Sequence, residues 1–181
     1  MARALDVPYV EGDDLHPKSN IEKMSSGHPL TDSDREPWLK LIRTTAEHMT
    51  LELQSGAKVD TEGNKRGVVI SCSALKKRYR DVLRGGGGGL LESPNPILKT
   101  VFVYIEGTRD VLMDRMTKRT GHFMKPSMLD KQLEALENPV HEEGIIVVSL
   151  MDSTEDQVRV AQQGLKRVLN MMGMEVVSGD S

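Results

Sequence analysis

Four short apolar runs set the framework of this sequence. They are VPYV at 7–10, GVVIS at 67–71, KTVFVYI at 99–105 and GIIVVSL at 144–150. Each is nearly continuous in hydrophobicity, which is typical of strands buried on both faces of a parallel sheet. Segments with helical periodicity separate them. This alternation predicts a doubly wound α/β domain, with helices on both faces of a parallel sheet.

The helical segments have recognisable ends. Gly56 is expected to end the first long helix, and the glycines after residue 84 are expected to end the second. Polar caps or a proline mark the starts. The predicted helices begin at Thr31 or Asp32, at Ser73, at Thr108, at Pro126 and at Ser153.

Composition narrows the class of protein. The chain has 181 residues, of which 38% are apolar and 28% charged, as in an ordinary globular domain. A net charge of −3 with both signs interspersed argues against nucleic acid or an anionic membrane as the main partner. The single cysteine, Cys72, excludes an intrachain disulfide and fits a reducing compartment. No apolar run is long enough to span a bilayer, so we expect a cytoplasmic protein.

The most biased segment is RGGGGGLLESPNP at 84–96, which contains the run Gly85–Gly89. A phosphate-binding loop would need a Lys-Ser or Lys-Thr pair leading into a helix, and none follows Gly89. These glycines also follow a helix rather than a strand. The pattern therefore favours a flexible linker.

The acidic stretch EGDDLHP follows the first apolar run. Open α/β sheets bind ligands at the carboxyl ends of their strands, and a carboxylate there can accept a proton from a hydroxyl group. The structural alternative is that Asp13 or Asp14 only caps the helix that follows. His16, which precedes Pro17, can by itself be an ordinary turn residue.

Three basic segments are further candidates. Arg35 is predicted in the first turn of a helix, where a cation does not complement the dipole, so it can instead bind a carboxylate. Lys76 and Arg80 are four residues apart and are expected on one helical face beside Tyr79. RMTKRTGHF gathers Arg115, Lys118, Arg119 and His122, as a mobile lid over a phosphoryl group would. For all three, a solvated or dipole-complementing basic surface is the alternative.

Together these segments resemble the gluconokinase family, which makes 6-phosphogluconate from gluconate and ATP. The resemblance rests on GDDLHPKSNIEKMSSGHPLTDSDREPWL at 12–39, CSALKKRYRDVLR at 72–84, the Arg115 and KRTGHF lid segment, and QLEALENP at 132–139. They occur in the family's order from Val7 to about Val148. The resemblance implies the phosphate-loop (P-loop) kinase fold of the shikimate and adenylate kinase group. In this fold a parallel sheet lies between two layers of helices, which makes three layers, α/β/α.

The resemblance also implies catalytic and binding roles for individual residues. Asp13 would orient and deprotonate the 6-hydroxyl, and Arg119 would act on the transferring group. Arg115 and Arg119 would contact the ATP phosphates, and Glu11 would lie near the magnesium ion that accompanies ATP. The implied substrate-binding residues are His16, Arg35, Lys76, Tyr79, Arg80, His122 and Gln132.

The sequence departs from the family at its start. Gluconokinases open with an apolar strand and a GxSGSGKS-type loop, whereas this chain opens with MARALD and contains no G-x-x-x-x-G-K-[ST]. That strand would lie between those at 67–71 and 99–105. We therefore expect a kinase domain over residues 1–175 that lacks its first central strand and phosphate loop, with a lid at about 113–127 and a tail at 176–181. The family also suggests a homodimer.

Three functions follow from these observations. The first is gluconokinase activity, with weak or no turnover by this chain alone. The second is a kinase for another small polyhydroxy acid. The third is a degenerate member that binds a sugar acid without catalysis, which the missing phosphate loop favours and the lid cations oppose.

Overall fold

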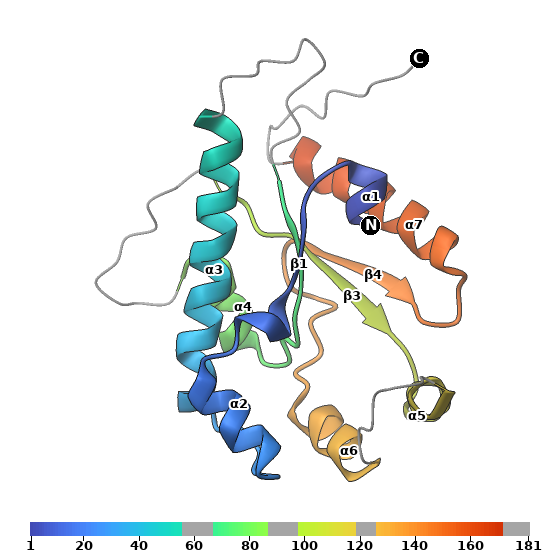
Figure 1. Cartoon of the computed structure of the whole chain (residues 1–181). Coiled ribbons are helices and arrows are strands. Elements are labelled where there is room, and N and C mark those ends of the chain that lie inside the picture. Colours follow the sequence, from blue (N-terminus) through green and yellow to red (C-terminus); the bar gives the residue numbers. More distant parts are fainter. Residues whose placement is uncertain (56–66, 87–97, 119–125, 172–181) are drawn as a thin grey trace. The chain divides into compact units, whose positions relative to one another are not determined.

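The computed structural model describes residues 1–55, 67–86, 98–118 and 126–171. The chain divides into two compact units, one formed by Met1–Thr100 and the other beginning at Val101. Each unit contains one pair of parallel strands together with the helices that cover it (Figure 1).

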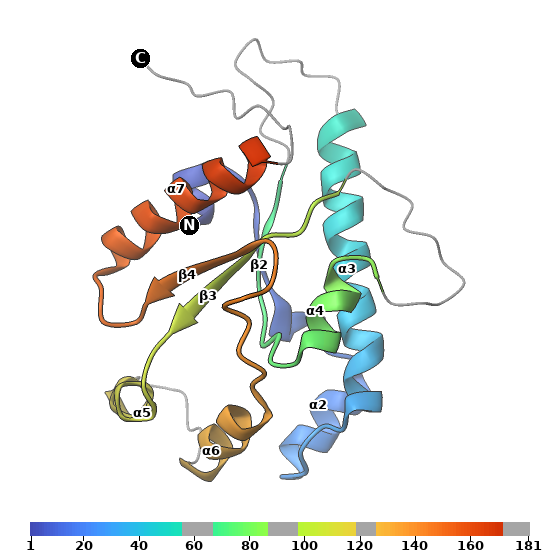
Figure 2. The same cartoon turned by 180° about the vertical axis from the view of Figure 1, so that it is seen from behind.

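The first unit contains strands β1 and β2, which pair in parallel with Tyr9 opposite Val69 and Glu11 opposite Ser71. Helix α3 packs against α4, as Figures 1 and 2 show from opposite sides. The elements in chain order are α1 (Ala2–Leu5), β1 (Tyr9–Glu11), the 3₁₀ turn η1 (Gly12–Leu15), α2 (Lys18–Ser25), α3 (Asp32–Ser55), β2 (Val69–Ser71) and α4 (Lys77–Leu83).

The second unit contains β3 and β4, paired in parallel from Phe102 opposite Ile145 to Glu106 opposite Ser149. Helix α7 packs on β4, and Gly164 lets it approach closely: a Cβ there would lie 2.6 Å from Cγ2 of Ile146. The elements are β3 (Phe102–Glu106), α5 (Arg109–Lys118), α6 (Pro126–Ala135), β4 (Ile145–Ser149) and α7 (Thr154–Met171).

The four predicted strands are confirmed, and both pairs are parallel. Within the described residues they form two separate pairs, β1–β2 and β3–β4, rather than one continuous sheet. No pairing joins the strand at 69–71 to that at 102–106 in these ranges. The additional strand that the family resemblance implies between them stays a prediction. The division into a single domain with a lid and a tail stays a prediction.

Most predicted helix starts are also confirmed. Thr31 caps α3, because its Oγ1 accepts from the Asp34 N–H at 3.3 Å while the Asp34 carboxylate accepts from the Thr31 N–H at 2.6 Å. Ser153 caps α7 in the same way, accepting from the Asp156 N–H at 3.1 Å. Gly85, with φ +91°, follows the end of α4 as predicted. The predicted stop at Gly56 and the glycines from 87 to 89 lie outside the described residues.

The predicted cap at Ser73 is wrong. Helix α4 begins at Lys77, and Lys76 precedes it with an extended backbone (φ −100°, ψ 148°). Lys76 is therefore not helical, so the expectation that Lys76 and Arg80 share one helical face is wrong as well. The short elements α1, η1 and α2 were not predicted from periodicity.

Among the helices described, none combines the length and apolar character needed to cross a membrane.

Candidate active site

The site begins where β1 and β2 end together. Because parallel strands present their carboxyl ends at one edge, the η1 turn after Glu11 and the loop after Ser71 lie side by side. Gly12 makes this approach possible: a Cβ at this position would lie 2.1 Å from the Ser71 carbonyl oxygen and 3.1 Å from Cβ of Cys72. Only glycine therefore fits at the first residue of the turn.

Carboxylates dominate the electrostatics of this edge. Glu11 accepts hydrogen bonds from the Tyr9 hydroxyl at 2.7 Å and from the Ser71 hydroxyl at 2.5 Å. Burial, followed by the negative charges of Asp13 and Glu11, raises the pKa of the Cys72 thiol to about 11. The thiol is therefore neutral, and its shift shows that both carboxylates act on one small region.

His16 is held firmly beside Asp13. Its side chain is only 5% exposed and stacks on Trp38, with ring centroids 4.3 Å apart and planes 11° apart. Trp38 is fully buried and donates through Nε1 to the Gly12 carbonyl at 2.7 Å, which ties the η1 turn to α3. His16 is thus part of a rigid assembly and more than a turn residue.

Three predicted residues come together around this imidazole. His16 Nε2 lies 4.0 Å from Oδ1 of Asp13, whose side chain is 71% exposed and open to a ligand. Burial lowers the pKa of His16; Asp13 partly opposes that shift, and the positive charge of Arg35 adds to it. The Asp13 carboxylate and the Arg35 guanidinium therefore both act on the neutral imidazole of His16.

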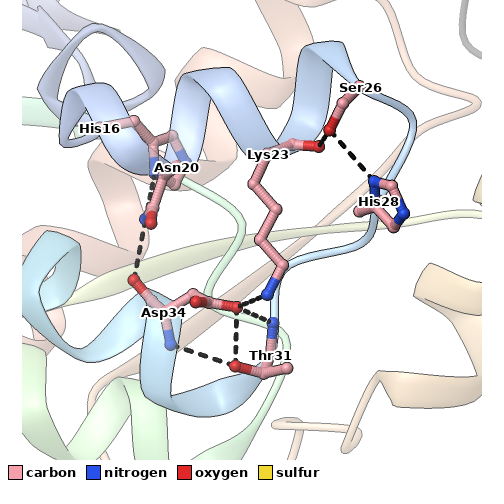
Figure 3. Close-up of polar contacts among 7 residues, drawn as sticks. All are labelled: His16, Asn20, Lys23, Ser26, His28, Thr31 and Asp34. Atoms are coloured by element: carbon pink, nitrogen blue, oxygen red, sulfur yellow. Dashed lines mark hydrogen bonds and ion pairs between the residues drawn. The ribbon is translucent and has the colours of Figure 1, made fainter.

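A hydrogen-bonded network behind these groups joins α2 to the start of α3 (Figure 3). Asn20, 4% exposed, donates to the Asp34 carbonyl at 2.8 Å, and its Nδ2 lies 3.3 Å from Nδ1 of His16. Lys23 donates to the Asp34 carboxylate at 2.6 Å. The pKa of Asp34 is strongly lowered, first by the hydrogen bond from Lys23 and then by those from Thr31. The network fixes the α3 turn that carries Arg35.

Asp32, in the same turn of α3, forms hydrogen bonds and ion pairs with a second set of residues. Its carboxylate accepts from Lys76 Nζ at 2.9 and 3.0 Å and from the Tyr79 hydroxyl, and it pairs with Arg78. The Lys76 ammonium also lies 5.8 Å from the Tyr79 ring centroid. Two predicted substrate ligands, Lys76 and Tyr79, are thus placed together by an aspartate that sequence reasoning considered only as a helix cap.

Arg80 lies deeper than the predicted ligands around it. Its side chain is 2% exposed, and Nη1 donates to the carbonyls of Ala74 and Leu75 at 2.7 and 3.0 Å. These bonds hold the loop after β2 in its extended form. The structure therefore shows Arg80 supporting the loop that carries Lys76, and direct contact with a substrate stays a prediction.

The remaining candidates belong to the second unit. Arg115 donates to the Leu150 carbonyl and lines an open depression with Asp110, Val111, Asp114 and Met151. Gln132 is half-buried on α6. Arg119 and His122 lie outside the described residues. The roles predicted for these four residues stay predictions.

The described ranges contain no group of three His, Cys, Asp or Glu side chains placed to hold a metal ion. Glu11, the residue that the family resemblance puts near magnesium, accepts hydrogen bonds from Tyr9 and Ser71, and its role near the ion stays a prediction. The donor set in these ranges therefore does not form a resident metal centre.

Sequence reasoning missed several residues that build the site. Asn20, Asp34 and Trp38 were not singled out. A usable signal was present: two aspartates, at 32 and 34, stand in the first turn of a helix directly before Arg35. Their partners, however, lie up to 47 residues away, at Tyr79, which periodicity cannot reveal.

Comparisons with known proteins fit this geometry. No family model matches the chain. A gluconokinase from Sinorhizobium meliloti superposes with a TM-score of 0.71 at 41% identity, covering 95% of this chain and 84% of that one. A sugar kinase from Janibacter gives a TM-score of 0.69 at 36% identity, covering 91% and 83%. The parallel strands and these neighbours define an α/β P-loop kinase fold.

Sequence relatives narrow the class further. A probable gluconokinase of Schizosaccharomyces pombe is 41% identical over 157 residues, which are 87% of this chain and 73% of that protein. The thermoresistant gluconokinase of Escherichia coli is 39% identical over 168 residues, covering 92% and 83%. The chain belongs to the gluconokinase family.

Proposed function

We propose that the protein transfers the γ-phosphoryl group of ATP to the 6-hydroxyl of D-gluconate, giving 6-phospho-D-gluconate and ADP. The observation that carries this proposal is the pair of Asp13 and His16 after β1, with the positive charge of Arg35 on α3 acting on His16, in a chain of the gluconokinase family. An exposed carboxylate beside a buried neutral imidazole suits a hydroxyl acceptor. A nearby guanidinium suits the carboxylate of a sugar acid.

In the proposed reaction, the 6-hydroxyl gives its proton to a carboxylate oxygen of Asp13. The hydroxyl oxygen forms the new bond to the γ-phosphorus while the bond to the β–γ bridging oxygen breaks and ADP leaves. Arg35 binds the gluconate carboxylate, and Lys76 and Tyr79, held by Asp32, border the sugar acid. His16 orients the acceptor end of the site.

The donor side of the proposal draws on the second unit. Arg115 lines a depression that includes Met151, whose side chain is exposed, and we assign this region to ATP. Arg119 and His122 belong to the lid in this proposal, and the substrate role of Gln132 is carried over from the family resemblance. Magnesium would enter bound to ATP, with Glu11 near it. A cytoplasmic location and a homodimer remain predictions.

Binding and turnover are tested separately. Calorimetry on the chain should detect gluconate, and Arg35→Ala should weaken that binding by about tenfold or more, as expected for loss of a charge-assisted bond. Gluconate that fails to bind, or binding unchanged in Arg35→Ala, would contradict the acceptor site. Substituting a neutral polyol for gluconate checks that the loss depends on the carboxylate.

Turnover is followed by coupling 6-phosphogluconate to its dehydrogenase. Because the 181 residues lack G-x-x-x-x-G-K-[ST], we expect weak turnover by the chain alone and higher turnover by a fusion that adds an N-terminal strand and a GxSGSGKS-type loop. In that fusion Asp13→Asn should lower kcat by roughly 10²–10⁴-fold. Asp14→Asn, the same charge change one residue away, is the matched control and should stay near the parent.

The absent phosphate-loop motif favours one alternative, a sugar-acid-binding protein without kinase activity. Gluconate binding without ATP binding, in the chain and in the fusion, would support it. A third possibility, a kinase for another small polyhydroxy acid, predicts a higher kcat/KM for that acid than for gluconate in the same coupled format.

A further inference from the structure

The His16 imidazole is constrained on one face and at Nδ1. Trp38 stacks on one face, with the ring planes 11° apart. Nδ1 lies 3.3 Å from Nδ2 of Asn20, and Nε2 lies 4.0 Å from Oδ1 of Asp13. A ring held in this way has a fixed orientation, so the position of its proton decides what it presents to the site.

The Asn20 amide determines that position. A backbone carbonyl only accepts hydrogen bonds, so the 2.8 Å contact with the Asp34 carbonyl requires the nitrogen end of the amide to face it. The same nitrogen faces Nδ1 of His16 (Figure 3). An amide nitrogen only donates, and its two hydrogens serve these two acceptors. Nδ1 must therefore offer its lone pair.

We infer that Asn20 is a positioning residue that fixes His16 as the Nε2–H tautomer, so that the imidazole presents an N–H donor towards the Asp13 carboxylate. The neutral form is favoured because burial and the charge of Arg35 lower the pKa of His16. An imidazole whose Nε2 carries the proton cannot accept one there.

This inference adds to the proposed function. It rests on the proposed function only where the His16 Nε2–H is said to hold the hydroxyl group of the substrate. At 4.0 Å the Nε2–H does not bond Asp13 directly, and it can hold an acceptor hydroxyl oxygen between the two side chains. The hydroxyl proton then has one acceptor, Asp13. Asn20 thereby assigns the base role to the aspartate and the donor role to the histidine.

A purely structural role for Asn20 would be to tie α2 to α3, and a loss of stability cannot distinguish the two roles. The ¹⁵N chemical shifts of the His16 ring can, because a protonated and an unprotonated ring nitrogen resonate far apart. The measurement uses the whole chain without ATP or gluconate, at a pH where His16 is neutral. His16→Gln assigns the signals among the five histidines.

In the wild-type chain we expect a lone-pair shift for Nδ1 and a protonated shift for Nε2. Two averaged shifts, or the reverse pattern, would overturn the inference. Asn20→Asp places an acceptor beside Nδ1 and should move that nitrogen to the protonated position. An unchanged pattern in a folded Asn20→Asp would also overturn it. If Asn20→Asp does not fold, the ¹⁵N shifts of the wild-type His16 ring still test the inference.

Lys23→Met is the matched control. It removes the ion pair with the Asp34 carboxylate but leaves the Asn20 contacts with His16 and the Asp34 carbonyl, so the His16 shifts should stay as in wild type. A switch of tautomer in this control would show that the helix junction as a whole, rather than Asn20, sets the proton position. Because no substrate is involved, failure of this test and failure of gluconate binding are separate results.

Discussion

The two compact units bury different kinds of side chain. Among the described residues of the first, six polar or charged residues are at most 9% exposed, including Asn20, Arg43, Glu47 and Arg80. In the described part of the second, the buried residues are apolar, such as Ile146 and Val148 on β4 and Ala161 on α7. The first interior therefore adds directed hydrogen bonds to an apolar core that includes Trp38 and Leu39, whereas the described part of the second is held by apolar packing.

This difference in buried side chains is consistent with the functional role proposed for each unit. Buried polar groups must find partners, so each one fixes the orientation of its neighbours. In the first unit those neighbours include His16 and the α3 turn with Arg35, where an acceptor hydroxyl would have to be held accurately. In the second unit the apolar interface between α7 and β4 stabilises the fold but does not orient individual polar groups.

The largest predicted effect tests the polar interior. Arg43 donates to Glu47 at 2.6 Å and to the Leu83 carbonyl at 3.0 Å, and both charged side chains are buried. Arg43→Met should lower the free energy of unfolding by about 3–5 kcal/mol, because it leaves a buried carboxylate without its charged partner. Ile146→Val in the second unit should cost only about 0.5–1.5 kcal/mol.

Urea denaturation measures both variants. The double variant Arg43→Met with Glu47→Leu should recover most of the loss, since it removes the stranded charge. A double variant no more stable than Arg43→Met, or an Arg43→Met loss as small as that of Ile146→Val, would remove the distinction between the two interiors.

The second prediction compares two close approaches. Gly164→Ala should cost about 1–3 kcal/mol by overpacking, because the new methyl meets the Ile146 side chain. Gly12→Ala should cost more than Gly164→Ala, because its methyl meets the Ser71 carbonyl at 2.1 Å and backbone cannot rotate away. Thermal unfolding ranks the two, and Gln163→Ala, at an exposed helical position, should stay within about 0.5 kcal/mol of wild type. Equal losses would show that the β1–β2 edge yields as easily as a side chain.

The third prediction concerns a feature that the units share. Thr31 caps α3 and Ser153 caps α7 through equivalent bonds: each hydroxyl donates to the carboxylate of the aspartate three residues later and accepts from its backbone N–H. Thr31→Ala and Ser153→Ala should each lower the free energy of unfolding by about 1 kcal/mol. A clearly larger loss for Thr31→Ala would mean that the polar interior depends on the cap, which would sharpen the contrast between the units.

The smallest effect is a dependence on pH. The pKa of His16 is lowered by burial, so the unfolded chain takes up the proton first and stability should fall as pH drops below about 6.5. The pKa values of Asp34 and Asp156 are lowered by their cationic partners, so their contribution is present above about pH 4 and is lost on further acidification. Denaturation midpoints between pH 7 and 5 should flatten in His16→Gln. An unchanged slope would exclude His16 as its source.

Local patterns predicted much of the fold. Continuous β-branched runs placed all four strands, and Thr31 and Ser153 marked two helix starts, because both signals depend on residues within a few positions. The Ser73 cap failed for a tertiary reason. Buried Arg80 binds the carbonyls of Ala74 and Leu75, and this holds extended a segment whose local sequence favours a helix.

The site was only partly predictable. The family motif identified Asp13, His16 and Arg35, and the electrostatic coupling of His16 to the other two fits that grouping. Asn20 could not be recognised, because a helical asparagine gives no signal until its partners at 16 and 34 are known. Asp32 was hidden similarly, since its contacts with Lys76 and Tyr79 are distant in sequence.

The raised pKa of Cys72 has a practical consequence. At pH 7 a thiol with a pKa of about 11 is ionised in only about one molecule in 10⁴, and the thiolate is the form that reacts with alkylating reagents. The single native cysteine should therefore be chemically quiet in the folded protein. A second cysteine introduced at an exposed position can then carry a fluorophore or spin label selectively, so the motions of either unit can be followed without altering the β1–β2 edge.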